Sequence, residues 1–222
     1  MDITNDQISE FFDLYYSPLD EDMMRFRAVN EEEKVPLILR ETEGLLSILL
    51  KTKKPKRILE IGTAYGYSAI FFAKTCPNAE IITIDRSPKM ISNARKTFDT
   101  YSEGKRIRFI TGDASDKLNE LISESIKFDF VFIDAGKSHY KNFFEKAEIM
   151  CNPGAIIVCD NILMRGWTVN SKAEIGRRHR TNAKYLRQFI EYLSLRKDLD
   201  VTFSKSGDGL AIIRIPDQRD NI

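Results

Sequence analysis

The stretch Ile58-Leu-Glu-Ile-Gly-Thr-Ala-Tyr-Gly-Tyr-Ser68 decides how the rest of this chain is interpreted. Its pattern predicts a buried strand over Arg57 to Ile61, a glycine loop over Gly62 to Gly66 and a helix over Tyr67 to Lys74. Glycine at both ends of the loop lets the backbone turn tightly and approach a ligand that a Cβ atom would block. The stretch therefore predicts a ligand-binding turn at the end of a buried strand.

The spacing of these glycines distinguishes between two classes of cofactor. Dinucleotide-binding loops carry the pattern G-x-G-x-x-G. Here the pattern is Glu-x-Gly-x-x-x-Gly, with Glu60 two residues before Gly62. A carboxylate at the strand end would repel a pyrophosphate, but it suits the ammonium and sulfonium groups of S-adenosylmethionine (SAM). The loop favours a methyl donor over a nicotinamide, although the glycine pair alone would equally fit another strand-to-helix turn.

Polar residues recur where the later predicted strands end. Asp85 lies roughly 20 residues beyond the glycine loop, where a ribose-binding carboxylate is expected. Because ligands bind at the carboxyl ends of parallel strands in open α/β sheets, the repetition predicts a site along one sheet edge. The predicted strands and the polar residues after them are Glu80–Asp85, Arg106–Thr111 with Gly112-Asp113-Ala114-Ser115, Phe128–Ile133 with Asp134-Ala135, and Ala155–Cys159 with Asp160-Asn161.

The alternation of strand and helix patterns predicts the fold class. We expect an α/β, doubly wound, mostly parallel seven-stranded Rossmann-like sheet with helices on both faces and an N-terminal helical addition. The last two strands, Asp200–Ser204 and Leu210–Ile215, are expected to pair, with one of them antiparallel to the rest. The helices of the core are predicted near 67–75, 88–101, 115–123, 139–150 and 174–197.

The residues before the first strand predict the helical addition. Amphipathic stretches around Ile8 to Tyr16 and Met23 to Val29 indicate two short helices. Pro36 stands near the start of a third predicted helix, which runs to about Leu50. The segment Lys51 to Lys56 is interpreted as a linker.

Length and composition limit the class of protein. The chain has 222 residues and a mass of 25.6 kDa, and its 42% hydrophobic content is sufficient for a core. No apolar run approaches the roughly 20 residues that span a bilayer, and the N-terminus lacks a signal-peptide pattern. We therefore expect no membrane partner. The three cysteines have no metal or redox spacing, so we expect buried thiols in a reducing compartment and a cytoplasmic protein. The expected organisation is one domain over 1–222, with helices in 1–52 and the cofactor- and metal-binding core in 53–222.

Charge is distributed unevenly along the chain. Residues 1–50 hold twelve acids and four bases, whereas residues 165–197 hold nine bases and two acids. These regions can complement one another within the fold or across a dimer, or the basic region can meet an anionic substrate.

Asp134, Asp160 and Asn161 form a second group of candidate residues. Two carboxylates and one amide oxygen at neighbouring strand ends make a hard oxygen site suited to Mg²⁺. The alternative is that each of these residues caps a turn.

Three further side chains follow these strand ends. Lys137 lies within reach of the same pocket, where a nearby divalent cation would favour its neutral form as a proton acceptor; alternatively it is a solvated loop lysine. His139 could line the adenine of the cofactor or lie at the surface. Trp167 could wall the acceptor pocket or contribute to a dimer interface.

Taken together, these motifs resemble the cation-dependent O-methyltransferases, the group of the catechol and caffeoyl-CoA enzymes. The resemblance runs from about Val35 to the C-terminus. Its signatures are Leu59-Glu-Ile-Gly-Thr-Ala-Tyr-Gly-Tyr-Ser68, Ile84-Asp85, Gly112-Asp-Ala114, Phe128-Asp-Phe-Val-Phe-Ile-Asp-Ala-Gly-Lys137, Asp160-Asn161 and Gly207-Asp-Gly-Leu210.

The resemblance implies a role for each matching position. Asp134, Asp160 and Asn161 match the metal ligands, and Lys137, with Asp134, matches the catalytic pair. The residues expected to bind SAM are Ile38, Glu60, Gly62, Thr63, Ser68, Asp85, Ala114 and Asp134.

Within that group the chain looks most similar to the bacterial branch that methylates 5-hydroxyuridine at the tRNA wobble position. The basic region suits a polyanion, because phosphate contacts dominate nucleic-acid affinity. An ordinary solvated helix face, or a catechol or CoA thioester as substrate, remains the alternative, and a homodimer is expected. The tentative substrate residues are Arg165, Trp167, Arg177, Arg178 and Arg180.

Two more distant interpretations remain open. A nicotinamide oxidoreductase would need the G-x-G-x-x-G pattern that the loop lacks. A non-catalytic binding protein with the same fold is possible in principle, because fold does not determine function.

Overall fold

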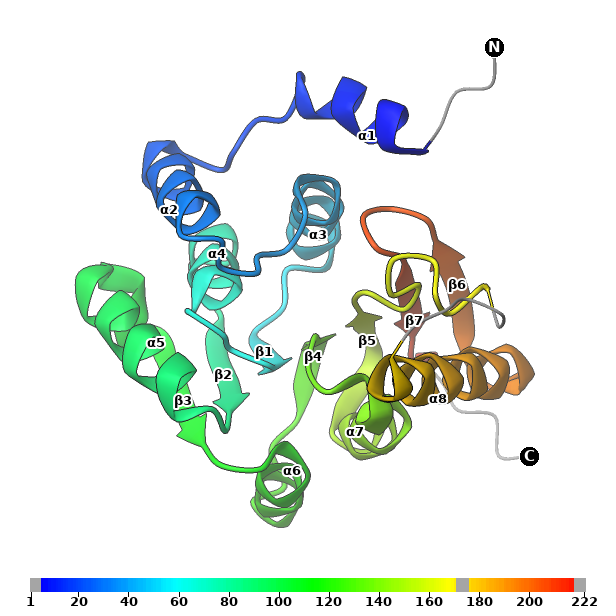
Figure 1. Ribbon diagram of the computed structural model, residues 1–222. Helices are drawn as coiled ribbons and strands as arrows, with labels where there is room; N and C mark the ends of the chain where they lie inside the picture. Colours follow the sequence, from blue (N-terminus) through cyan, green and yellow to red (C-terminus); the bar gives the residue numbers. More distant parts are fainter. Residues whose placement is uncertain (1–4, 171–175, 218–222) are drawn as a thin grey trace.

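Figure 1 shows one sheet with helices on both of its faces in the computed structural model of the protein. The structure describes residues 5–170 and 176–217. The sheet has seven strands in the order β3-β2-β1-β4-β5-β7-β6. Neighbours from β3 to β5 are parallel, whereas β7 is antiparallel to both β5 and β6, so the predicted fold is confirmed. The strands are β1 Arg57–Ile61, β2 Glu80–Asp85, β3 Ile107–Thr111, β4 Phe128–Ile133, β5 Cys151–Cys159, β6 Asp200–Ser204 and β7 Leu210–Arg214.

The helices form two layers around this sheet. Helices α2 to α5 pack on one face, and α6 to α8 pack on the other (Figure 1). The α-helices of the described residues are α1 Asn5–Asp13, α2 Glu21–Glu32, α3 Arg40–Lys53, α4 Tyr67–Thr75, α5 Pro88–Thr100, α6 Ala114–Ser123, α7 Tyr140–Ile149 and α8 Arg177–Leu195. Two 3₁₀ helices, η1 Ser102–Arg106 and η2 Lys137–His139, complete the described part.

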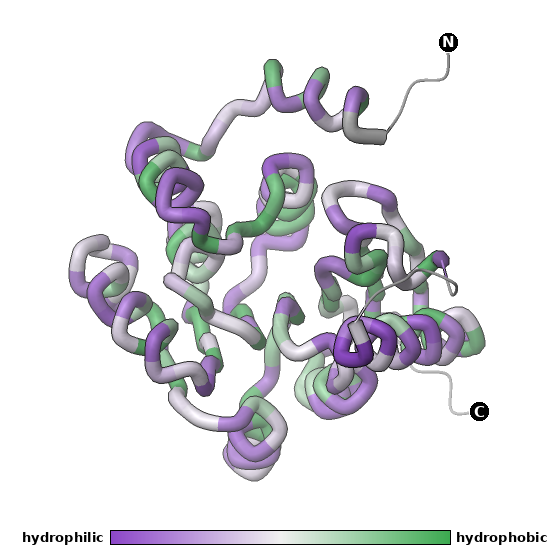
Figure 2. Tube along the Cα trace, in the orientation of Figure 1, coloured by the Kyte–Doolittle hydropathy of each residue, from purple (hydrophilic) through white to green (hydrophobic). Residues whose placement is uncertain are grey.

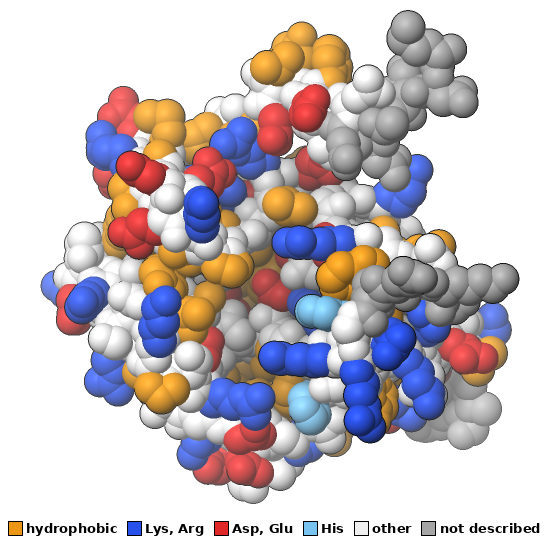
Figure 3. Space-filling model, viewed as in Figure 1, with side chains coloured by type: hydrophobic (Ala, Val, Ile, Leu, Met, Phe, Trp, Pro, Cys, Tyr) orange, Lys and Arg blue, Asp and Glu red, His pale blue; other side chains and the backbone are white. Residues whose placement is uncertain are grey.

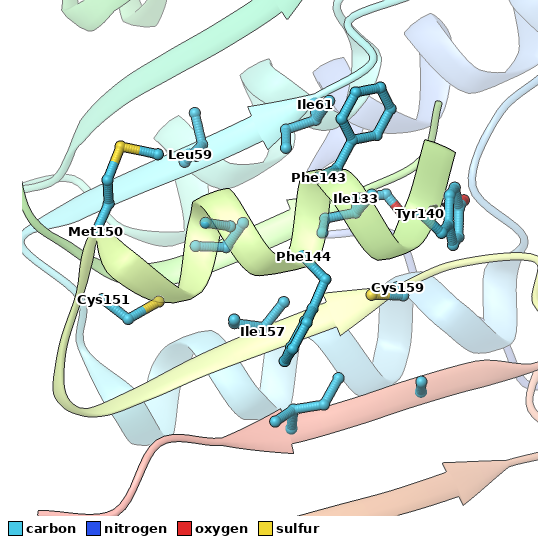
Figure 4. Packing of buried hydrophobic residues seen from close by; sticks show 14 of the residues in the cluster. Leu59, Ile61, Ile133, Tyr140, Phe143, Phe144, Met150, Cys151, Ile157 and Cys159 are labelled. Carbon is cyan, nitrogen blue, oxygen red and sulfur yellow. Dashed lines mark hydrogen bonds between the residues drawn. The ribbon is translucent and has the colours of Figure 1, made fainter. Parts of the chain in front are cut away.

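The central strands are apolar because helices cover them on both faces. Strand β4 has the sequence Phe-Asp-Phe-Val-Phe-Ile, and all but its second residue are buried. Figure 2 shows hydrophobic residues gathered on the strands and on the inner sides of the helices. In Figure 4, Phe143 and Phe144 of α7 point from the helix toward the sheet, where they join one core cluster with Ile61 and Ile157. Such continuous apolar runs are typical of a parallel sheet buried on both sides.

The N-terminal helices differ from the prediction at the third helix. It begins at Arg40 rather than near Pro36, and it continues to Lys53, into the segment interpreted as a linker. Leu39 precedes the helix with an extended backbone (ψ 154°), and the Ile38 carbonyl accepts a hydrogen bond from Arg27. The Ile38 carbonyl, which would lie in the first turn of the predicted helix, is therefore paired with the side chain of Arg27 from another helix. The predicted start of the last helix at Glu174 lies outside the described residues, and α8 begins at Arg177.

The order of the strands places a crevice beside the glycine loop. The sheet grows in opposite directions from β1 and β4, which are parallel neighbours. At such a switch point the helices that follow the two strands leave on opposite faces, and a crevice opens at the carboxyl ends of the strands. Gly62 and Asp134 follow these two strands directly. No helix in the described part of the chain is long and apolar enough to cross a membrane.

Candidate active site

A cavity of about 800 Å³ lies at the carboxyl edge of the sheet. Its volume suits a nucleotide-sized ligand, and its wall combines backbone of the glycine loop with apolar and acidic side chains. The hollow is visible near the centre of Figure 3, with acidic side chains at its floor. The sequence-predicted residues that line it are Ile38, Gly62, Thr63, Ser68, Asp85, Ala114, Asp134, Lys137, His139 and Asn161.

The glycine loop adopts a shape that only glycine allows at two positions. Gly62 has φ +106°, and a Cβ atom there would lie 2.0 Å from the carbonyl oxygen of Asp134. Gly66 has φ +84° and forms the N-cap of α4, with the ring of Phe98 directly against it. The backbone can therefore press the loop onto the end of β4, and the first turn of α4 faces the cavity through Tyr67 and Ser68.

Asp85 braces this loop from the neighbouring strand. One of its oxygens accepts hydrogen bonds from the backbone N–H groups of Thr63 (3.1 Å) and Ala64 (3.0 Å). The other accepts from the N–H of Ser87 at 2.8 Å. The carboxylate lines the cavity and fixes the loop in one conformation, and its role in holding the ribose stays a prediction.

Glu60 occupies a different position from the other predicted cofactor residues, because it lies behind the cavity wall. Its side chain is fully buried, and Oε2 accepts a hydrogen bond from the Thr83 hydroxyl (2.5 Å), which in turn pairs with the Thr63 hydroxyl at 2.6 Å. Within the described part of the chain the other oxygen, Oε1, has no partner at hydrogen-bond distance, although the Ser68 hydroxyl lies near the carboxyl group. Burial raises the pKa of Glu60 from 4.5 to about 8, and the hydroxyls of Ser68 and Thr83 only partly oppose it.

Thr83 is a residue that the sequence analysis missed. It is the direct register partner of Glu60 in the parallel β1–β2 pair, so the two side chains share one face of the sheet. The signal available in the sequence is one hydroxyl inside the apolar run of β2, which has the sequence Glu-Ile-Ile-Thr-Ile-Asp. Its partner could not be found without the strand register.

The three predicted metal ligands lie together next to the cavity. Asp134 and Asn161 line it, and Asp160 is buried behind them at 1% exposure. Asp160 Oδ1 accepts hydrogen bonds from the Asn161 backbone N–H (2.6 Å) and side-chain amide (3.2 Å), which aims the amide. Asn161 has φ +56°, a left-handed conformation that asparagine tolerates better than most residues. Burial, and then the neighbouring Asp134, raise the pKa of Asp160 to about 7.

A cation already fills the space between these oxygens, and it is the ammonium group of Lys137. Its Nζ donates to Asp134 Oδ1 (2.7 Å) and Asn161 Oδ1 (3.1 Å), and to the hydroxyl of Tyr140 (2.7 Å). The Tyr140 hydroxyl in turn donates a hydrogen bond to the Asp160 carbonyl oxygen at 2.7 Å. The residues therefore fit a divalent cation, because hard oxygen donors converge on a point that holds positive charge. Within residues 5–170 and 176–217 no group of three or more His, Cys, Asp and Glu side chains could hold a metal, so the site depends on the Asn161 amide oxygen.

The tentative substrate residues lie outside the cavity. Trp167 packs against His179 of α8 with ring centroids 4.8 Å apart, and Arg187 holds the backbone carbonyl groups of Trp167 and Thr168. Arg165 is exposed, and its backbone N–H donates to Asp208.

The basic side chains of α8 form a surface beside the cavity. Arg177, Arg178 and Arg180 are exposed, and Figure 3 shows Lys and Arg side chains gathered where α8 lies in Figure 1. A shallow groove there is lined by Arg177, Arg178 and Tyr185 together with His139. Because His139 lines both the groove and the cavity, the two are neighbours.

Comparison with known proteins identifies the family. The sequence model of the family described as O-methyltransferase matches residues 15–215, nearly the whole chain. This chain belongs to that O-methyltransferase family. The enzyme is therefore a SAM-dependent O-methyltransferase, as the glycine loop and the strand-end residues predict.

Two curated relatives of this O-methyltransferase carry small-molecule names. A catechol O-methyltransferase of Niastella koreensis is 36% identical over 170 residues, which are 73% of this chain and 77% of the relative. A caffeoyl-CoA O-methyltransferase of Stellaria longipes is 29% identical over 174 residues, covering 77% of this chain and 72% of the relative. A crystal structure of a Podospora anserina methyltransferase with bound SAH has a TM-score of 0.82 at 26% identity and covers 98% of this chain and 99% of that one. The predicted methyl donor agrees with this ligand.

Replacing Glu60 with Gln should change how the stability of the cofactor-free enzyme depends on pH. Between pH 4.5 and about 8 the unfolded chain carries Glu60 as a carboxylate while the folded protein holds it as an acid, so unfolding releases a proton. The free energy of unfolding should then fall with rising pH through this group, by on the order of 1 kcal/mol per pH unit. Glu60→Gln should remove that component, measured by urea denaturation between about pH 5 and pH 8. Equal pH slopes for both proteins would contradict the raised pKa.

Replacing Lys137 with Met should tighten the binding of Mg²⁺ to the enzyme without an acceptor. In the wild type the ammonium must leave Asp134 and Asn161 before another cation can take its place. Removing this competitor should lower the Kd for Mg²⁺ by about tenfold in isothermal titration calorimetry. Lys141→Met is the matched control, because Lys141 forms an exposed pair with Glu145 one turn further along. Unchanged or weaker Mg²⁺ binding by Lys137→Met would show that the ammonium does not occupy the cation site.

Proposed function

We propose that this O-methyltransferase transfers the methyl group of SAM to a hydroxyl of a small aromatic acceptor that carries a second oxygen beside it. A catechol or the caffeoyl group of a CoA thioester has this arrangement. The observation that carries the proposal is that Asp134 and Asn161, two of the candidate metal ligands, line the same cavity as the glycine loop that is expected to hold SAM. An acceptor oxygen at these residues therefore lies in the same enclosed space as the methyl donor, and proximity of this kind supplies much of the catalysis.

Asp134, Asp160 and Asn161 are the residues that would hold Mg²⁺ or another divalent cation. Bound there, the cation would supply a Lewis acid that lowers the pKa of the acceptor hydroxyl. Displaced from Asp134 and Asn161 by the cation and in its neutral form, Lys137 would accept the proton of that hydroxyl through Nζ. Burial raises the pKa of Tyr140 well above its ordinary value, so its hydroxyl remains a neutral group that orients the lysine.

The names of the relatives support a small acceptor over tRNA. The two curated relatives described above act on catechol and caffeoyl-CoA according to their names, and they match about three quarters of this chain. The expectation of a wobble-position 5-hydroxyuridine in tRNA remains as a second candidate. It is favoured by the exposed Arg177 and Arg178, which line a groove beside the cavity and could contact phosphates.

An assay of methyl transfer from radiolabelled SAM identifies the acceptor. The candidate acceptors are catechol, caffeoyl-CoA and tRNA from cells that lack 5-methoxyuridine, each with Mg²⁺ or with a chelator. We expect label on the catechol-type acceptors with Mg²⁺ and close to background with the chelator, because the hydroxyl is then not activated. Asp134→Ala should abolish the stimulation by Mg²⁺.

The double variant Arg177→Glu, Arg178→Glu distinguishes the two candidates further. Its turnover of catechol should change less than about twofold, since both side chains lie outside the cavity. Label on tRNA alone, lost in this variant and steeply dependent on salt, would replace the small acceptor by the nucleic-acid substrate.

We also propose that the enzyme is a homodimer that uses α1. Helix α1 and the residues after it expose five large hydrophobic side chains, which a monomer would leave in water. Light scattering after gel filtration should give a mass twice 25.6 kDa, and Phe11→Glu with Phe12→Glu should shift it to the monomer. A mass of 25.6 kDa for the wild type at all concentrations would exclude the dimer. The exposed side chains are Ile8, Phe11, Phe12, Leu14 and Tyr15.

A further inference from the structure

A buried polar network joins the N-terminal helices to the glycine loop. Its centre is Glu43 of α3, which is 2% exposed and whose carboxylate pairs with the guanidinium of Arg27 from α2. The carboxylate also accepts hydrogen bonds from the hydroxyl groups of Tyr67 (2.7 Å) and Tyr16 (2.5 Å). Tyr67 is the first residue of α4, directly after Gly66. Four segments that are distant in the sequence therefore meet at one carboxylate.

Two members of this network reach the wall of the cofactor cavity. Arg27 donates from Nη2 to the backbone carbonyl of Ile38 at 3.0 Å, and Ile38 lines the cavity. The guanidinium also lies over the ring of Tyr67, 4.9 Å from its centroid, and Tyr67 lines the cavity as well. Arg27 thus fixes two wall elements at once, the extended segment before α3 and the start of α4.

The segment with Ile38 needs this support because it is not a regular element. Leu39, the N-cap of α3, has an extended backbone and makes no side-chain capping bond. The carbonyl of Ile38 receives its hydrogen bond from a side chain of another helix instead of from its own turn. Its position over the cavity therefore depends on where Arg27 is held.

Stability alone does not account for a buried ion pair of this kind. Moving two charges out of water costs about as much as their attraction returns, and apolar replacements of similar volume are often neutral or stabilising. Burial, and then the Glu43 carboxylate, raise the pKa of Tyr67 well above its ordinary value, so its hydroxyl stays a donor. A network that contributes little net stability but fixes geometry is expected where geometry matters.

We propose that Arg27 and Glu43 are positioning residues that set the affinity for SAM by holding Ile38 and Tyr67 in the cavity wall. The inference rests on SAM as the methyl donor and does not depend on which acceptor the enzyme uses. The N-terminal helices then act as part of the cofactor site, although Arg27 and Glu43 do not line the cavity.

The test removes every polar side chain of the network while keeping its volume. The variant combines Arg27→Met, Glu43→Leu, Tyr16→Phe and Tyr67→Phe, so that no charged or hydroxyl group within the network is left unpaired. Glu31, a further partner of Arg27, keeps its pair with Arg40. We expect its cofactor-free Tm to stay within a few degrees of the wild type, while the Kd for SAM in isothermal titration calorimetry rises by at least about tenfold. Arg25→Met on the same helix is the control, because the ion pairs that Arg25 makes among the described residues, with Glu21 and Asp22, are exposed. The control should leave both values unchanged.

Two results would overturn the proposal. A variant that keeps both Tm and Kd would show that the network does not position the wall. A variant that loses both together would show a merely structural role.

If the combined variant does not fold, the single change Tyr67→Phe tests the proposal instead. It removes one hydroxyl from Glu43 and keeps the ring in the wall. We expect the Kd for SAM to rise by about threefold or more while the cofactor-free Tm stays within a few degrees of the wild type, and an unchanged Kd would contradict the proposal. If the wild type did not bind SAM, SAM itself would be excluded as the methyl donor. Wild-type binding without turnover of catechol would affect only the proposed acceptor.

Discussion

The close contact between Gly62 and Asp134 is the constraint on which the rest of the site depends. The loop N–H of Gly62 donates to the Ile84 carbonyl, and the N–H of Asp134 donates to the Ile61 carbonyl, each at 2.9 Å. The carbonyl oxygen of Asp134 then lies 2.0 Å from where a Cβ atom of residue 62 would be. Because these backbones touch, the cofactor loop and the first metal-ligand candidate share a wall, and any side chain at position 62 would separate them.

The acidic residues that converge on this edge are each accommodated in a different way. Asp85 accepts hydrogen bonds from backbone N–H groups, and Asp134 pairs with the ammonium of Lys137. Glu60 carries no charge, because its burial favours the acid form. Acids gathered at one edge would otherwise repel one another in a poorly solvated space. This edge therefore favours positively charged groups, as the ammonium of Lys137 beside Asp134 illustrates.

The N-terminal helices belong to the same arrangement. The Arg27–Glu43 pair joins α2 to α3 and contacts the cavity wall through Ile38 and Tyr67. A glycine loop is intrinsically free to move, so its shape has to be imposed from outside. Here Asp85 holds its middle, and Tyr67 and Glu43 hold its end.

The sequence alone determined the order of the strands along the chain, the glycine loop and the residues at the carboxyl edge, whereas β5 begins at Cys151 rather than at the predicted Ala155. Apolar β-branched runs, glycine spacing and polar strand ends are local signals, and parallel strands bring their ends together in any such fold. Tertiary structure alone decided that Glu60 lies behind the wall on Thr83, that Lys137 fills the oxygen cluster, and that α3 begins at Arg40. These features depend on strand register and on side chains from distant segments, whose meeting no local pattern records.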